Sequence, residues 1–125
     1  MKTVIHTPNA PAPIGPYSQA ILQGDTLYVS GQIALDPQTG TLHTDDISSE
    51  TRLVMSNLGA VLQAAGMGFE NIVKCSIFIA DMAQFAAINA VYGEYFPNDP
   101  PARETVEVAC LPKNVNVEIS AIAVR

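Results

Sequence analysis

The sequence predicts one α+β domain in which helices cover one face of a six-stranded sheet. The chain has 125 residues, which fits a single domain spanning residues 1–125. Hydrophobic residues make up 48% of it, enough to form a core without metal ions or disulfides. Segments of alternating apolar residues are interrupted by two segments of helical periodicity, which is typical of helices layered on a sheet.

The N-terminal part predicts an extended loop followed by a hairpin. Four prolines between residues 7 and 16 remove backbone donors and indicate an extended loop that forms few hydrogen bonds. Strands are expected over residues 19–23 and 27–30. Gly24-Asp25 lies between them and suits a tight turn.

A first helix is expected from about residue 46 to residue 65. Its apolar residues recur at steps of three and four and form one stripe that includes Val54, Leu58 and Val61. Acidic and serine residues at 45–48 are plausible N-caps, and Gly66 and Gly68 are expected to end the helix.

The remaining elements alternate between strand and helix. Residues 73–80 predict a strand covered on both faces, because Cys75, Ile77 and Ile79 alternate with other apolar residues. A second helix is expected over residues 83–96, before a run of prolines, and two closing strands over about 103–111 and 115–124. The expected order is β-β-β-α-β-α-β-β.

The low content of charged residues predicts an oligomer. Only 14% of residues are charged, against roughly 25% in typical domains. Apolar interfaces between subunits would explain this, although an uncharged polar surface is an alternative. The net charge is −6 and the six basic residues are scattered, so nucleic-acid binding is not expected.

Cysteine and histidine usage predicts neither disulfides nor a metal site. Cys75 and Cys110 lack CxxC spacing, and we expect both to be buried free thiols. His6 and His43 are isolated, so neither a metal nor another cofactor is expected. We find no signal peptide and no long apolar run, which predicts a cytoplasmic protein with no membrane partner.

The last 25 residues contain the two residues best suited to chemistry. Arg103 follows Pro101-Ala102 at the start of a strand, and its planar guanidinium could pair with a carboxylate. Glu118 lies on the final strand, on the face opposite Val117 and Ile119, where an unpaired carboxylate would be costly. A structural Arg103–Glu118 ion pair and a functional site both fit this pattern.

Three weaker candidates lie elsewhere. Gly31, in Ser30-Gly31-Gln32, could let the backbone approach a ligand, or it could be a plain bulge glycine. Tyr17 could cover a pocket or lie in the core. Asn89 borders the apolar stripe of the second helix, where most asparagines serve only local structure.

Several of these segments together resemble the RidA/YjgF family, over essentially the whole chain. The matching segments are Ala10-Pro11 through Ile14-Gly15-Pro16-Tyr17-Ser18-Gln19-Ala20, Val29-Ser30-Gly31-Gln32-Ile33, Ala64-Ala65-Gly66, Ile72-Val73-Lys74, Pro101-Ala102-Arg103 and Val117-Glu118-Ile119. The resemblance implies a chorismate-mutase-like α+β fold, a six-stranded mixed sheet with two helices on one face. It also implies a homotrimer with ligand clefts between subunits.

The resemblance also implies roles for individual residues. Arg103 would grip a substrate carboxylate, and Glu118 would position the attacking water. Gly31 would supply a backbone contact. Further substrate-binding positions are Tyr17, Ser30, Asn89 and Thr105.

Two positions depart from the family pattern. Thr105 stands where bacterial members often have Cys, and Glu104 replaces a small residue. The resemblance implies hydrolysis of imines, a reaction that requires no thiol. Thr105 is therefore not expected to abolish activity, although it could change the pocket's shape. Strand alternation should separate Glu104 from Arg103.

The implied activity is hydrolysis of 2-enamine and 2-imino acids to 2-oxo acids and ammonia. Such intermediates, including 2-iminobutanoate and 2-iminopropanoate, are released by pyridoxal-phosphate dehydratases. Two other functions stay open: a regulatory module that binds small carboxylates or oxo acids without catalysis, and a ribonuclease. The absence of a basic patch argues against the ribonuclease.

Overall fold

A computed structural model describes all 125 residues and confirms the α+β class. Short 3-10 turns occur at Phe69–Asn71 (η1), Met82–Gln84 (η2) and Pro112–Asn114 (η3). The main elements, in chain order, are β1 (Lys2–Ile5), β2 (Ala20–Gln23), β3 (Thr26–Gln32), α1 (Ile47–Ala64), β4 (Ile72–Ile79), α2 (Phe85–Gly93), β5 (Ala102–Glu107) and β6 (Val117–Val124).

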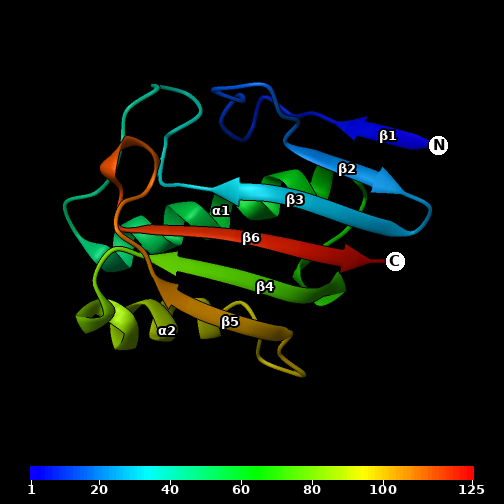
Figure 1. Cartoon of the computed structure of the whole chain (residues 1–125). Helices are drawn as coiled ribbons and strands as arrows, with labels where there is room; N and C mark the ends of the chain where they lie inside the picture. The colour runs from blue at the N-terminus through cyan, green and yellow to red at the C-terminus, as the bar shows by residue number, and fades with distance from the viewer.

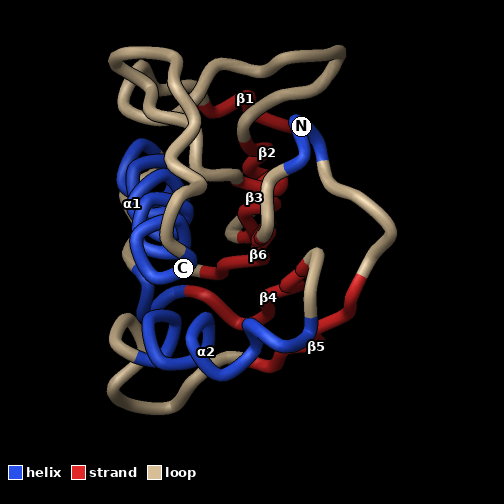
Figure 2. Tube along the Cα trace, turned by 90° about the vertical axis from the view of Figure 1, so that its left-hand side faces the viewer, coloured by secondary structure: helices blue, strands red, loops and turns tan.

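One six-stranded sheet runs through the molecule in the order β1-β2-β3-β6-β4-β5 (Figure 1). The β4–β5 pair is parallel and the other pairs are antiparallel, so the sheet is mixed as expected. Both α-helices lie on the same side of it (Figure 2). The C-terminal strand β6 is therefore central, whereas β5 forms an edge.

Helix α1 forms the larger part of the helical layer, and its ends follow simple capping rules. The Asp46 carboxylate accepts a hydrogen bond from Ser49 N at 2.9 Å, which satisfies a free N–H of the first turn. At the other end Gly66 adopts a φ of +73°, and Met67 N donates to Leu62 O, as in a Schellman motif.

No helix of the structure combines the length and apolar character needed to cross a membrane.

The core lies between the helices and the sheet. The predicted stripe of α1 is fully buried there, together with the alternate residues of β6 that begin with Val117 and Ile119. These odd-numbered residues of β6 face the helices. Glu118 and the other even-numbered residues therefore point to the opposite face.

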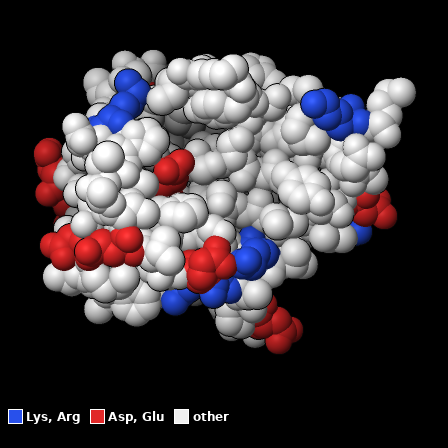
Figure 3. Space-filling model, viewed as in Figure 1, with Lys and Arg blue, Asp and Glu red and all other residues white.

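The opposite sheet face is covered by the chain only at one end, where Phe78 packs against the apolar cluster around Leu111 and Val115. The expectation that β4 is covered on both faces therefore holds only in part. Apolar side chains remain accessible on it: Tyr28 is 51% exposed and Val106 is 40% exposed. The centre of this face carries few charged side chains (Figure 3). A single chain therefore presents a large and mostly uncharged surface.

Several details differ from the sequence prediction. The Val73 side chain is exposed and does not share the buried face of β4 with Cys75. The reason is that the register of β4 against β6 shifts between Ile72 and Lys74. Cys110 is also exposed, since β5 ends at Glu107 and leaves Cys110 in a loop. Cys75 is fully buried as predicted, and burial raises the pKa of its thiol.

Candidate functional site

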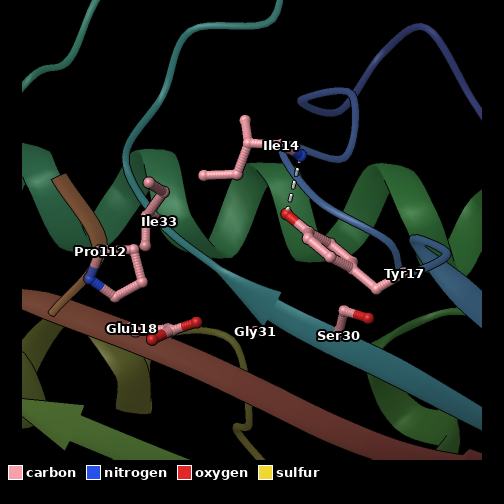
Figure 4. Close-up of a pocket in the computed structure, with 7 residues that line it drawn as sticks. All are labelled: Ile14, Tyr17, Ser30, Gly31, Ile33, Pro112 and Glu118. Atoms are coloured by element: carbon pink, nitrogen blue, oxygen red, sulfur yellow. Dashed lines mark hydrogen bonds between the residues drawn. The ribbon is translucent and has the colours of Figure 1, made fainter.

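A cleft with a volume of about 320 Å³ lies on the uncovered face of the sheet, where β3 and β6 meet the N-terminal loop. Its walls come from four separate parts of the chain (Figure 4). The lining residues are Ile14, Tyr17, Ser30, Gly31, Ile33, Pro112 and Glu118. Four of the predicted site residues therefore come together here: Tyr17, Ser30, Gly31 and Glu118.

Gly31 leaves a space beside the backbone that the Glu118 side chain occupies. A Cβ built on Gly31 would be 2.8 Å from Glu118 Cδ and closer still to one carboxylate oxygen. The β3–β6 register also shifts between Val29 and Gln32, so Gly31 lies in a bulge. The interpretation of Gly31 as a bulge glycine is therefore confirmed, and the bulge leaves room for the carboxylate beside the backbone. The contact of this backbone with a ligand stays a prediction.

Glu118 has the properties of a proton acceptor. Its carboxylate forms no hydrogen bond or ion pair within the chain, yet the residue is only partly accessible at the cleft. Burial raises the pKa of Glu118 above its ordinary value, because desolvation penalises the charged form. A carboxylate that lacks a protein partner and lines a cleft can accept a proton from water.

Tyr17 and Ser30 line the cleft, but their hydroxyl groups already have partners. Tyr17 is 47% exposed, so it is not a core residue, and its hydroxyl accepts a hydrogen bond from Ile14 N at 3.2 Å. Ser30 Oγ donates to Ser18 O at 2.6 Å. Both side chains therefore fix the cleft wall, and their oxygens keep lone pairs for a ligand.

Arg103 forms a second polar centre, on β5 next to α2. Its Nη1 donates to Asn89 Oδ1 at 2.7 Å. The guanidinium carbon lies 5.1 Å from the centroid of Tyr92 and 5.7 Å from that of Phe85, within the range of cation–π contacts. One amide and two rings thus orient an exposed guanidinium whose other N–H groups stay available to an anion.

The strand registers place Arg103 and Glu118 on opposite faces of the sheet. Arg103 pairs with the buried Cys75, so it shares the helix-covered face. Glu118 pairs with Phe78, which has the opposite orientation on β4. The chain accordingly contains no Arg103–Glu118 ion pair, and the predicted residues form two groups rather than one.

Thr105 and Glu104 also follow strand alternation. Thr105 lies on the Arg103 side of β5, where its buried hydroxyl has no hydrogen-bond partner. Glu104 points the other way, where its carboxylate contacts Lys74 Nζ at 2.9 Å and the Ser76 hydroxyl. As expected, Glu104 therefore does not compete for the guanidinium.

Three of the residues that line the cleft were not predicted as site residues, namely Ile14, Ile33 and Pro112. Ile33 directly follows the Gly31 segment, and that proximity was the available signal. Pro112 reaches the cleft through the turn η3, whose position agrees with the gap predicted between the two closing strands, although nothing in the sequence indicated that this turn lies at the cleft.

The chain is similar to known proteins over nearly its whole length. The family model described as endoribonuclease L-PSP matches residues 7–125. A RutC family protein from Pyrococcus horikoshii is 51% identical over 98% of this chain and 98% of its own length. The 2-iminobutanoate/2-iminopropanoate deaminase of Capra hircus is 46% identical over 100% of this chain and 91% of its own length.

A solved structure shares the whole architecture. The crystal structure of Escherichia coli TdcF with bound serine is 43% identical, with a TM-score of 0.94 over 98% of each chain.

Proposed function

Because the chain belongs to the endoribonuclease L-PSP family, also known as RidA/YjgF, we propose that it hydrolyses 2-enamine and 2-imino acids to 2-oxo acids and ammonia. The substrates would include 2-iminobutanoate and 2-iminopropanoate, the compounds named for the goat relative. The observation that supports this best is that the chain has both groups that the reaction needs. The Arg103 guanidinium is oriented and accessible, and the Glu118 carboxylate has no protein partner.

The two groups suit this reaction. Arg103 would bind the substrate carboxylate through two N–H groups and so orient the imine carbon. Glu118 would take a proton from water as the oxygen attacks that carbon. Glu118 then returns this proton to the amine of the resulting carbinolamine and the C–N bond breaks. The departing ammonia takes the hydroxyl proton and leaves as ammonium, and the C=O bond forms. One iminium and one water thus give one 2-oxo acid and one ammonium.

The site we propose is shared between subunits of a homotrimer. Arg103 and Glu118 face opposite sides of one sheet, so one chain cannot direct both at the same small molecule. The uncovered apolar face supports association, because its burial would remove accessible side chains such as Tyr28 and Val106 from water. Glu118 and Tyr17 of one subunit would then meet Arg103 and Asn89 of the next.

Mixing two inactive variants tests this arrangement. Arg103→Ala and Glu118→Gln subunits, co-expressed with different tags and purified as mixed trimers, should recover activity in about one of the three clefts of each trimer. Light scattering should give the mass of three chains. Mixed oligomers with no activity, or a monomer mass at micromolar concentration, would contradict the shared site.

A coupled assay tests the activity itself. A threonine dehydratase generates 2-iminobutanoate, and this protein should accelerate release of 2-oxobutanoate above the uncatalysed rate. The alternative is a binding module that recognises small carboxylates with the same residues but does not turn imines over. Binding of 2-oxobutanoate without any acceleration would favour that module.

A ribonuclease function receives no support from the charge distribution. The six basic residues are scattered, and the face shown in Figure 3 has no continuous blue area. Binding of a phosphate backbone depends on clustered cations.

The pH dependence of the rate should report Glu118. The base is active only when ionised, so kcat should fall as the pH is lowered through the Glu118 pKa. Because burial raises this pKa, the fall should begin above the ordinary glutamate value of about 4.3. Rates would be measured from pH 4.5 to 8, with the uncatalysed hydrolysis subtracted at each pH. The acidic limb should be absent from Glu118→Gln; an unchanged limb would exclude Glu118 as its origin.

A further inference from the structure

The loop formed by residues 7–17, here called the proline loop, brings Ile14 and Tyr17 to the cleft but is poorly held by its own backbone. Four of its residues are prolines without an N–H. Its only internal backbone hydrogen bond joins Tyr17 N to Gly15 O at 2.9 Å. Some other group must therefore fix its conformation.

The side chain of Gln19 supplies the missing contacts. It is 2% exposed, and its Oε1 accepts from Thr7 N at 2.7 Å. Its Nε2 donates to Thr7 O at 3.0 Å, to Pro11 O at 2.9 Å and to Ala10 O at 3.3 Å. One buried amide thus holds the first half of the proline loop at three residues.

The backbone around Gln19 is hydrogen-bonded to Ser30, one of the residues that line the cleft. Gln19 O accepts from Ser30 N at 3.0 Å, and Ser18 O accepts from the Ser30 hydroxyl. Ser30 and its neighbour Gly31 both line the cleft. Gln19 therefore connects the proline loop on one side with the bulge of β3 on the other.

We infer that Gln19 is a positioning residue for substrate binding: its amide sets the proline loop so that Ile14 and Tyr17 close one wall of the cleft. This inference rests on the proposed imine hydrolysis. Gln19 reaches none of the lining side chains that would carry out the chemistry. Its loss should therefore weaken substrate binding and leave the chemical step nearly intact.

Gln19→Glu is the sharpest variant, because it keeps the shape and removes the donors. At pH 8 a carboxylate would face three carbonyl oxygens, and the proline loop should move away. We expect KM to rise by at least about tenfold and kcat to change by less than about threefold. Both would be obtained from initial rates of 2-oxobutanoate release.

Acid should partly rescue this variant. Burial and the carbonyl oxygens favour the neutral form of the introduced carboxyl, which can donate one hydrogen bond again. The ratio of variant to unmodified KM should therefore decrease as the pH falls from 8 to 5.5. A ratio that does not change with pH would overturn the donor role.

Thr51→Val is the matched control for lost stability. Thr51 is also fully buried and polar, but its hydroxyl donates only to Ile47 O, within α1 and away from the proline loop. This variant should lower the melting temperature with no change in KM. Equal increases of KM in both variants would overturn the inference, because loss of stability would then explain them.

Loop order can be followed without turnover. The chain has no Trp, so Ala12→Trp, at an exposed position of the proline loop, introduces a single fluorophore. Its anisotropy should fall when Gln19→Glu is added at pH 8 and not when Thr51→Val is added. Unchanged anisotropy would overturn the inference. Lack of imine turnover in the unmodified protein would overturn only the proposed function, and the anisotropy would still decide the role of Gln19.

Discussion

Arg103→Ala is expected to lower kcat/KM for imine hydrolysis by roughly 30-fold to several thousand-fold, with little change in melting temperature. Removing one partner of a partly desolvated charge pair costs about 2–5 kcal/mol. About 1.4 kcal/mol corresponds to a factor of ten in rate. The melting temperature should change little, because the guanidinium is exposed and its only hydrogen bond is to Asn89.

Two further variants sharpen this prediction. Arg103→Lys keeps the charge but lacks the planar fork, so it should recover only part of the activity. Arg52→Ala is a matched control, because Arg52 is also exposed but its guanidinium is already paired with the Glu94 carboxylate at 2.7 Å. It should keep full activity. A stable Arg103→Ala protein with unchanged kcat/KM would remove the basis of the proposed function.

Local patterns were sufficient to predict most elements of the fold. The stripe of α1 and the alternation of β6 each repeat over several turns or residues, so their buried faces could be assigned without a structure. The Gly24-Asp25 turn is also as predicted, because β2 ends at Gln23 and β3 begins at Thr26.

The errors arise where a pairing between distant strands decides the outcome. Val73 fits the alternation of its own segment, and only the shifted register against β6 turns it outward. Cys110 fits a longer strand, but β5 ends at Glu107, after six residues paired with β4. Neither the shift nor the end of pairing is encoded in the few residues on either side.

The candidate site shows the same limit. Arg103, Glu118 and Gly31 could be chosen from their residue types and the resemblance, but their relation in space could not. Whether Arg103 and Glu118 share a face depends on the register of β5 against β4 and of β4 against β6. Those two registers exclude the internal ion pair and agree with the clefts between subunits that the resemblance implies.

Glu118→Gln is expected to reduce kcat by about 100-fold to 10,000-fold, the range usual for loss of a general base. The amide keeps the shape that fits beside Gly31, so the backbone and the cleft should not move. The Glu118 carboxylate has no protein partner to lose, and the melting temperature should therefore fall little or even rise. Only the capacity to accept a proton from water is removed.

Binding and turnover of this variant must be measured on the same sample. Calorimetry should show that 2-oxobutanoate binds Glu118→Gln within a few-fold of the unmodified protein, because Arg103 holds its carboxylate. Glu94→Gln is the control for loss of one negative charge, since Glu94 is exposed and pairs only with Arg52. It should keep the full rate. Equal losses of binding and turnover in Glu118→Gln would assign Glu118 to substrate binding instead of water activation, because a group that acts only on the attacking water contributes to the transition state and not to the bound product.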